Sequence, residues 1–461
     1  MRFGHCLRDA SQVNQAIPRN RLTYIACHLI VIDYDKTSRS TKTNIMSNGF
    51  TFPAGFLWGA ATAAHQVEGN NTNNDSWLLE NVAGSVFAEP SGDAIDHYHR
   101  YRDDIALLAG LGFNTYRFSL EWARIEPEEG KFSRASLDHY RRMLAACHEY
   151  GLKPVLTYHH FTSPRWLLAA GGWTSPNTPD RFARFCEQST RHLGDLIGAA
   201  CTLNEPNLPL LLSAMGFVPP PDVAAQAPMN INAARTLGIP PQQIAPFQFS
   251  ASPRAVETMI AAHHKGVQAI RSASPKKIPI GITLTIQDIQ AAEGGEAMAA
   301  QMQQAINGIY LDELQGDDFV GVQTYSRTRF GPHGMVPPPT GAEIVTQMGY
   351  EFYPEALEAT IRYAIAKTGL PVIVTENGIG THDDTRRVEY IRRALRGVAN
   401  CLRDGLDVRG YTYWSAFDNF EWSLGYNPTF GIIAVDRSTQ RRTAKPSAAY
   451  LGNISHANRL P

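Results

Sequence analysis

Eight short apolar runs recur along the chain from residue 56 onward, each followed by a longer stretch with helical periodicity. The runs are rich in Val, Ile, Thr and aromatic residues, which is typical of buried parallel strands. Parallel neighbours need crossover helices, so the alternation predicts an α/β fold, and eight repeats predict a (β/α)8 TIM barrel as a single domain. The runs are residues 56–64, 113–120, 153–160, 199–206, 278–285, 319–326, 371–378 and 408–415.

Helix signals are clearest in two of the intervening stretches. Residues 136–150 carry an apolar stripe at helical spacing and end at Gly151, a good stop residue. Residues 354–367 begin with proline in the first turn and end before Gly369. Residues 217–253, rich in Pro, Gln and Ala, predict instead a long loop after the fourth strand, forming one wall of the entrance to a site.

Composition excludes several classes of protein. With 43% hydrophobic residues among 461 and a net charge of −1, the chain should be a soluble globule without attraction to nucleic acid or an anionic membrane. A neutral small molecule suits this charge balance. The six cysteines show neither a C-x-x-C pair nor zinc-like spacing to histidine, so we expect free thiols, a reducing cytoplasmic location, no metal and no cofactor. Oligomeric state stays open.

The first 45 residues stand apart from this pattern. Leu22–Tyr34 is apolar but shorter than the ~20 residues of a membrane-spanning helix, and His28 interrupts it. A secretory signal begins with a short basic region and ends at a small-residue cleavage site, and neither is evident here. Met46 directly precedes the first barrel segment. We therefore expect residues 1–45 to be a dispensable extension, disordered or the product of an upstream start, and residues 46–461 to form the catalytic domain.

Polar and aromatic residues gather where the expected strands end. The carboxyl ends of barrel strands converge on one cavity, so these side chains can meet despite their separation in sequence. Only the fifth run contributes nothing obvious. The set comprises Gln66, Arg117, His160, Asn204, Glu205, Tyr325, Glu376, Asn377, Trp414, Glu421 and Trp422.

The chemistry of this set favours a sugar as the substrate. Amides and histidine can bind hydroxyl groups, and tryptophan faces can cover a pyranose ring. Retaining glycoside hydrolysis needs one carboxylate to attack the anomeric carbon and another to protonate the departing oxygen, about 5 to 5.5 Å away. Glu205 and Glu376 fit these two roles. A lone glutamate at a strand end is more often a salt-bridged residue, and the surrounding motifs reverse those odds.

Five segments in the same order resemble glycoside hydrolase family 1, and the resemblance extends from residue 52 to about residue 451. It implies Glu205 as acid/base, Glu376 as nucleophile, Arg117 beside the nucleophile to keep it ionised, and Tyr325 touching it. It also implies Trp414 as stacking platform, and glycone hydroxyls held by Gln66, His160, Asn204, Glu421 and Trp422. The segments are FPAGFLWGAATAAHQVEG (52–69), YRFSLEWARIEP (116–127), TLNEPN (202–207), VTENGI (374–379) and YWSAFDNFEWSLGY (413–426).

Within that family the motifs narrow the substrate. An intact Glu421-Trp422 pair favours a glycone that is not phosphorylated, because a carboxylate would repel phosphate. The presence of Glu205 favours O-glycosides over thioglucosides. We expect an exo-acting retaining β-glucosidase that hydrolyses disaccharides such as cellobiose and aryl β-D-glucosides, with fucosides and galactosides as further substrates. A transglycosidase, a silent sugar-binding protein and a metal-dependent hydrolase are the alternatives.

Some positions depart from the family pattern or carry a second interpretation. Gln323 stands where many members have asparagine, which leaves aglycone contacts open. His160 aligns with the sugar-binding histidine by its distance from a proline, and His159 fits less well. Tyr411 and Tyr413 could equally belong to the core or to the site. The basic pairs Arg386-Arg387 and Arg392-Arg393 predict a solvated helix face.

Overall fold

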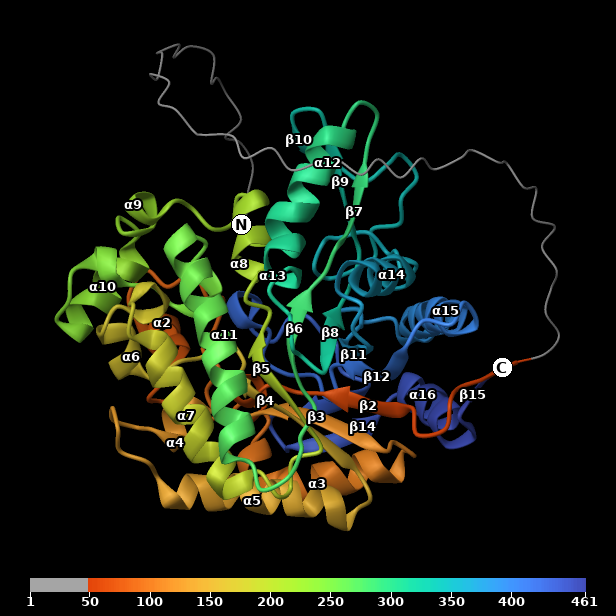
Figure 1. Ribbon diagram of the computed structural model, residues 1–461, viewed down its shortest axis with the longest axis horizontal. Helices are drawn as coiled ribbons and strands as arrows, with labels where there is room; N and C mark the ends of the chain where they lie inside the picture. Colours follow the sequence, from red (N-terminus) through yellow and green to blue (C-terminus); the bar gives the residue numbers. More distant parts are fainter. Residues whose placement is uncertain (1–48) are drawn as a thin grey trace. The chain divides into compact units, whose positions relative to one another are not determined.

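The computed structural model describes residues 49–461, and these contain the expected closed barrel of eight parallel strands (Figure 1). Each expected apolar run contains one strand, and the last strand pairs with the first to close the barrel. The fold prediction is confirmed. The barrel strands are β2 (Leu57–Ala61), β3 (Thr115–Ser119), β4 (Lys153–His159), β5 (Ala199–Asn204), β6 (Ile280–Thr285), β8 (Phe319–Gln323), β11 (Val372–Glu376) and β12 (Val408–Trp414).

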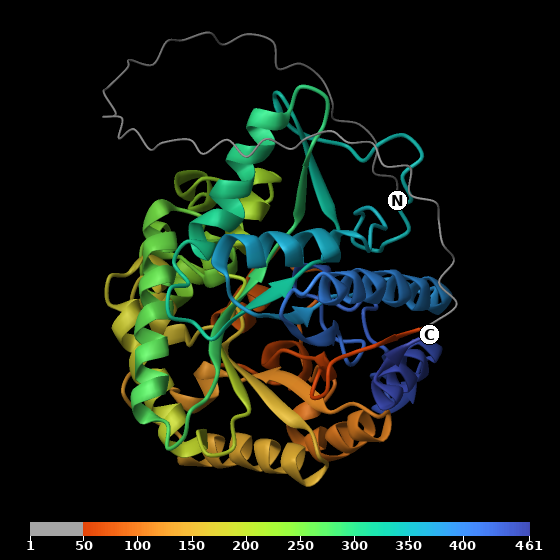
Figure 2. The same cartoon turned by 45° about the vertical axis from the view of Figure 1, so that its right-hand side comes forward.

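Helices surround the barrel and cover its outer face (Figure 2). The stretch expected to be helical from residue 136 forms α5, where Ser133 accepts a 3.2 Å hydrogen bond from the Ser136 N–H as the N-cap. The second expected helix forms α14, which ends at Gly369 in the left-handed conformation. The main outer helices are α3 (His97–Gly110), α5 (Arg134–Glu149), α7 (Thr178–Leu193), α11 (Pro253–Ala273), α14 (Ala356–Thr368), α15 (Asp384–Arg403) and α16 (Pro446–Ala457). A further helix, α12 (Glu296–Gln303), packs against β7 (Asp288–Ala291) and β9 (Arg327–Gly331).

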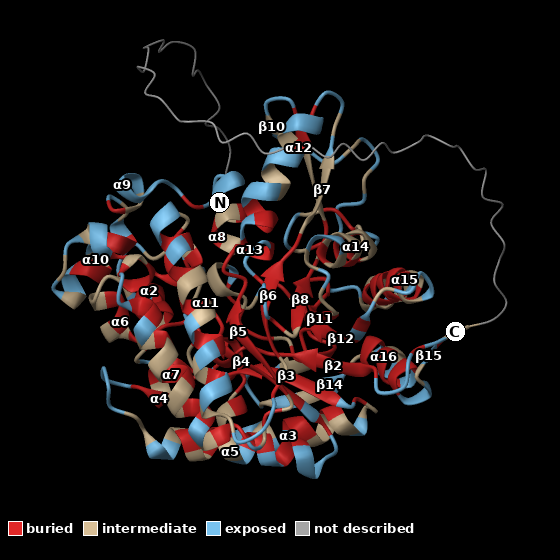
Figure 3. Ribbon diagram, in the orientation of Figure 1, coloured by how far each residue is buried: buried red, intermediate tan, exposed pale blue. Residues whose placement is uncertain are grey.

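The barrel interior is packed, as Figure 3 shows by the burial of its strands. Near the strand starts a cluster of buried side chains fills the interior, including Leu57, Val155, Ala199, Phe319 and Ile373. Polar chemistry is therefore confined to the opposite end, where the strands finish.

The segments that follow the barrel strands carry further elements. A three-stranded sheet of β7, β9 and β10 stands beyond the carboxyl ends of the strands, at the top of Figure 1. Two-stranded sheets pair β1 with β15 and β13 with β14. The remaining strands are β1 (Phe50–Thr51), β7 (Asp288–Ala291), β9 (Arg327–Gly331), β10 (Gly334–Val336), β13 (Ile433–Asp436), β14 (Arg441–Ala444) and β15 (Arg459–Leu460).

Short helical segments complete the described part of the chain. Several of them follow barrel strands directly and carry or flank residues of the expected site. They are α1 (Ala64–Val67), α2 (Asp75–Asn81), α4 (Trp122–Ile125), α6 (Arg165–Ala169), α8 (Leu208–Ala214), α9 (Pro221–Ala224), α10 (Pro228–Leu237) and α13 (Ile309–Leu311), a π-helix Gln304–Gly308, and the 3-10 turns Gly172–Thr174, Pro241–Gln243, Phe247–Phe249 and Trp422–Leu424.

The expectation of a long loop over residues 217–253 is wrong. The segment contains α9 and α10, each with proline in its first turn. Met229 and Ala233 of α10 are buried in one hydrophobic cluster with Leu78 and Leu79 of α2. Packing against α2 therefore stabilises a helix that is too short to be stable alone.

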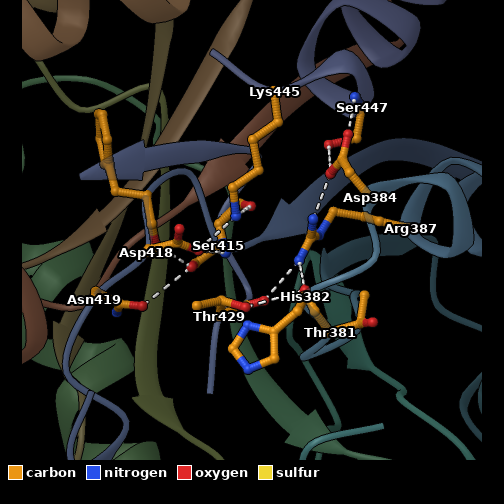
Figure 4. A network of polar contacts seen from close by, with 12 residues as sticks. Thr381, His382, Asp384, Arg387, Ser415, Asp418, Asn419, Thr429, Lys445 and Ser447 are labelled. Atoms are coloured by element: carbon orange, nitrogen blue, oxygen red, sulfur yellow. Dashed lines mark hydrogen bonds and ion pairs between the residues drawn. The ribbon is translucent and has the colours of Figure 1, made fainter. Parts of the chain in front are cut away.

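A buried arginine corrects a second expectation. Arg387 lies on the buried face of α15, whereas the other three arginines of the two basic pairs stay partly exposed. Its guanidinium pairs with Asp384 and donates to the carbonyl oxygens of Thr381 (2.5 Å) and Thr429 (2.7 Å), as Figure 4 shows. Ser447 of α16 donates to Asp384 from its N–H and its hydroxyl. The arginine thus ties α15 to two loops, and through Asp384 to α16.

The expected N-terminal extension lies outside the described residues. Within residues 49–461, every helix is too short or too polar to span a lipid bilayer. Four cysteines of this part are buried free thiols: Cys147, Cys186, Cys201 and Cys401.

Candidate active site

The structure brings the expected site residues together at the carboxyl ends of the barrel strands. Glu376 is the last residue of β11, Trp414 is the last residue of β12, and Glu205 directly follows β5. The pairing register shifts next to both glutamates, between β5 and β6 and between β8 and β11. Such irregularities re-aim side chains at the rims of barrels.

Glu376 is held by two donors. Arg117, buried on β3, donates a 2.6 Å hydrogen bond to Oε1, and the Tyr325 hydroxyl donates a 2.5 Å hydrogen bond to Oε2. Burial raises the pKa of Glu376 above its ordinary value, while the charge of Arg117 and both hydrogen bonds oppose that rise. The carboxylate is therefore fixed in orientation, and its ionised form is favoured over that of an isolated buried acid.

Glu205 has a different environment. Its backbone adopts φ 47°, a left-handed conformation that is costly for a residue with a Cβ and that concentrates at functional sites. Its Oε1 is buried without a hydrogen-bond partner among residues 49–461. Burial, followed by the negative charge of Glu376, raises the pKa of Glu205 well above its ordinary value. Glu205 is thus the carboxyl group that favours its proton.

Asn204 is oriented by three donors that meet on one oxygen. Its Oδ1 accepts from Arg117 at 2.6 Å, from Gln323 at 2.9 Å and from Thr283 at 3.0 Å. The amide nitrogen Nδ2 is left buried without a partner in the described chain. Because a buried amide normally satisfies its donors, Nδ2 is available for a substrate oxygen.

Two further polar side chains, Gln66 and His160, each have an atom without a hydrogen-bond partner among residues 49–461. Gln66 on α1 donates from Nε2 to the carbonyl oxygen of Phe420 at 2.6 Å and to Glu421 at 3.3 Å. Its Oε1, like Nδ1 of His160, is buried without a partner within the described part of the protein. These atoms and Asn204 Nδ2 supply a donor and acceptor set of the kind that binds sugar hydroxyls.

Aromatic rings complete the site. The His160 ring stacks on Trp414 with centroids 5.6 Å apart and on Trp422 at 6.3 Å, with interplanar angles of 18° and 11°.

Burial, followed by the charge of Glu376, raises the pKa of Glu421 to about 8. Trp422 adopts φ 51°, a second non-glycine residue in the left-handed region at the site.

The sequence does not indicate a role for Thr283, and it indicates Gln323 only as a departure from the family pattern. The fifth run was expected to contribute nothing, but Thr283 on β6 bonds Asn204, and its carbonyl accepts from the Glu205 N–H at 2.8 Å. Gln323 is buried, and its Nε2 donates to Asn204 Oδ1. A single threonine in an apolar strand gives no signal until the opposite strand is known. For Gln323, the departure from the family amide was the available signal.

The remaining open positions have clear surroundings. Tyr411 and Tyr413 are fully buried, and the Tyr411 hydroxyl donates to Asn377 Oδ1 at 2.9 Å, so both belong to the core that supports the strand ends. His159 bonds Ser163 and packs against Trp173, on the other side of β4 from the site. His160 is therefore the histidine that faces Trp414 and Trp422.

Comparison with known proteins shows the family to which the chain belongs. The model of glycosyl hydrolase family 1 matches residues 49–329 and 341–460. The β-glucosidase of Agrobacterium sp. is 31% identical over 460 residues, covering 88% of this chain and 95% of that protein. A bifunctional β-D-glucosidase/β-D-fucosidase of Bifidobacterium breve is 30% identical over 465 residues, covering 86% and 96%. The crystal structure of β-glycosidase BGL167 is 58% identical with a TM-score of 0.86, covering 88% and 97%. The chain belongs to glycosyl hydrolase family 1.

Proposed function

We propose that this protein is a retaining exo-β-glycosidase that hydrolyses non-phosphorylated β-D-glucosides, with Glu376 as nucleophile and Glu205 as acid/base. The observation that carries the assignment is the contrast between the two buried carboxyl groups. Glu376 accepts hydrogen bonds from a guanidinium and a phenol, which oppose the rise of its pKa. The pKa of Glu205 is raised well above its ordinary value, and its Oε1 has no partner among residues 49–461. One group is suited to attack and the other to donate a proton.

The first step forms a covalent glycosyl-enzyme. A carboxylate oxygen of Glu376 bonds to the anomeric carbon as the bond to the departing oxygen breaks, and Glu205 gives its proton to that oxygen. The ester formed at Glu376 carries no charge. Since the charge of Glu376 is one cause of the raised pKa of Glu205, esterification lowers that pKa.

The second step returns the enzyme to its starting state. Glu205, now a carboxylate of lower pKa, takes a proton from water as the water oxygen attacks the anomeric carbon. The bond to Glu376 breaks and the sugar leaves with its original configuration. The two carboxyl groups perform both steps, and we propose no cofactor and no metal.

Polar atoms without partners among residues 49–461, next to aromatic rings, support the binding of a hydroxylated sugar ring. In this proposal Asn204, Gln66 and His160 bind hydroxyls together with Glu421 and Trp422, and Trp414 is the stacking platform. The free atoms Asn204 Nδ2, Gln66 Oε1 and His160 Nδ1, without partners among residues 49–461, support it. The Agrobacterium relative is named a β-glucosidase, which supports glucose as the glycone of this protein. The Bifidobacterium relative is named a β-D-glucosidase/β-D-fucosidase, which supports fucose as a second glycone. Galactosides remain a further proposal.

Repulsion by Glu421 alone does not explain why 6-phosphorylated sugars should bind poorly. With a pKa of about 8, Glu421 is largely neutral at pH 7 and repels phosphate weakly. Two other factors oppose the binding of a 6-phosphate group. Glu376 is negatively charged, and a buried phosphate dianion would lack a cation because Arg117 already pairs with Glu376. We expect 6-phosphoglucosides to be poor substrates.

The experiment that tests the proposal is replacement of Glu376 by Gly, assayed on an aryl β-glucoside. Hydrolysis should be abolished while circular dichroism stays that of the folded enzyme. Retained hydrolysis would refute the assignment. A panel of aryl glycosides that differ only in the sugar then ranks glucose, fucose and galactose.

We further propose a cytoplasmic location and a small glycoside as the partner, without nucleic acid or membrane. The four buried free thiols of the described residues support a reducing compartment. Cell fractionation with an activity assay tests the location, and activity in a secreted fraction would contradict it.

A further inference from the structure

A row of stacked rings runs through the glycone site and ends at a residue without an assigned role. Trp414, His160 and Trp422 stack in sequence, and the His65 ring stacks on Trp422 with centroids 5.7 Å apart and an interplanar angle of 19°. We call these four rings the aromatic row. His65 is buried, and it directly precedes Gln66 on α1.

Both ring nitrogens of His65 are held by neighbours on or next to α2. Nε2 lies 2.5 Å from Glu80 Oε1, and Nδ1 lies 2.9 Å from Asn74 Nδ2. The Asn74 amide cannot turn over freely, because its Oδ1 accepts a 2.7 Å hydrogen bond from the Trp77 N–H as the helix N-cap. Nδ1 therefore accepts and Nε2 donates, and the ring is fixed in one tautomer and one plane.

Glu80 is itself immobilised. Its second oxygen, Oε2, accepts from the N–H and from the hydroxyl of Ser91, both at 2.8 Å. The side chains of Glu80 and His65 are fully buried. A carboxylate so committed cannot reach a substrate, but it can hold the imidazole in place.

The same network reaches the other histidine of the row. Asn74 Nδ2 also contacts Glu121 Oε2 at 3.3 Å, and Thr162 donates to that oxygen at 3.0 Å. Thr162 follows His160 by two residues, and Phe161 between them adopts φ 69°. Buried polar contacts thus anchor both His65 and the segment that carries His160.

On the substrate side, His65 adjoins two sugar-binding candidates. Gln66 follows it in α1 and donates to the carbonyl oxygen of Phe420, which joins α1 to the segment of Glu421 and Trp422. Trp422 holds a left-handed backbone conformation that persists only where the surroundings fix it. The stacked His65 ring is part of those surroundings.

We propose that His65 and Glu80 form a positioning pair that sets the Trp422 ring and the Gln66 amide against the glycone, and so determines how strongly the enzyme discriminates for each sugar hydroxyl. The inference rests on the proposed glycosidase function. Glu80 acts only through His65, and His65 acts through Trp422 and Gln66. Neither is a catalytic residue.

The test compares two variants with a matched control. Glu80→Gln keeps the shape and an oxygen for Ser91 but alters the contact to His65 Nε2, and His65→Phe keeps an aromatic ring but loses both bonds. The control is His97→Phe, which removes another buried histidine that pairs with a carboxylate, Asp104, at 2.8 Å. His97 lies on α3, and its ring packs against Tyr116 and Phe417, which are not part of the aromatic row.

The readout is the ratio of kcat/KM for an aryl β-glucoside to that of its 3-, 4- or 6-deoxy analogue, because this ratio does not depend on the folded fraction. Both Glu80→Gln and His65→Phe should lower at least one ratio about tenfold, the value of one well-placed buried hydrogen bond. His97→Phe should leave all three ratios within about twofold of the wild type.

Ratios unchanged in both test variants, even with lower overall activity, would overturn the proposal and leave the pair a merely structural role. An equal fall in His97→Phe would overturn it as well. A wild-type protein without glycosidase activity is a separate result, and it would overturn the proposed function itself.

Discussion

The guanidinium of Arg117 donates to Glu376 Oε1 at 2.6 Å and, with its other terminal nitrogen, to Asn204 Oδ1 at 2.6 Å. One buried cation on β3 therefore fixes a residue at the end of β11 and a residue at the end of β5. The two expected halves of the site, nucleophile and sugar-binding amide, share a single support. This explains how residues far apart in sequence acquire one geometry.

Replacement of Tyr325 by Phe should shift the pH dependence of kcat/KM. The tyrosine hydroxyl donates to Glu376 and lowers its pKa, so its loss raises the pKa of Glu376. Activity requires ionised Glu376, and the acid limb of the profile should therefore move to higher pH. The ring should stay in place against Phe430. An acid limb that stays fixed or moves to lower pH would contradict this account.

Replacement of Glu205 by Ala should slow substrates according to their leaving group. Cellobiose needs a proton on its departing oxygen, and kcat/KM should fall about 10²- to 10⁴-fold. The dinitrophenolate of a 2,4-dinitrophenyl glucoside leaves without a proton, so this substrate should form the covalent intermediate at nearly the normal rate. Stopped-flow measurement of the dinitrophenolate burst checks this. Equal losses on both substrates would show that Glu205 is not the proton donor.

Replacement of Arg387 by Met should destabilise the fold without altering the site. Loss of the buried guanidinium removes the cation that pairs with Asp384 and one donor from each of two carbonyl oxygens. Breaking such a buried ion pair should cost about 3 to 5 kcal/mol in the free energy of unfolding. As control, Arg392→Met removes a half-exposed partner of Glu389 and should cost less than about 1 kcal/mol. Urea unfolding compares the two variants. Equal stabilities would disprove the structural role of Arg387.

The barrel could be predicted because its signal is local. Each apolar run bounded by helical periodicity is visible without a partner, and all eight runs contain a strand. By contrast, α10 was missed because its buried face is defined by Leu78 and Leu79 of α2, more than 140 positions away in the chain. Its ten residues include two asparagines and a threonine, and a helix this short depends on its packing partner for stability.

The site divides in the same way. Glu205 and Glu376 lie in short motifs that resemble those of glycoside hydrolase family 1, and this resemblance makes them recognisable. Thr283, Arg387 and His65 acquire their roles from contacts with distant residues, and neighbouring letters do not reveal those contacts. His65 is the clearest case, because it adjoins an expected residue and gains significance only when Glu80 bonds its ring.

The central claim is that Glu376 captures the sugar covalently. Incubation with 2,4-dinitrophenyl 2-deoxy-2-fluoro-β-D-glucoside, whose fluorine slows the second step, should inactivate the enzyme with release of one dinitrophenolate per chain. Peptide mass spectrometry should then place the fluoroglucosyl group on Glu376. A label on any other residue, or turnover without a trapped ester, would contradict the account.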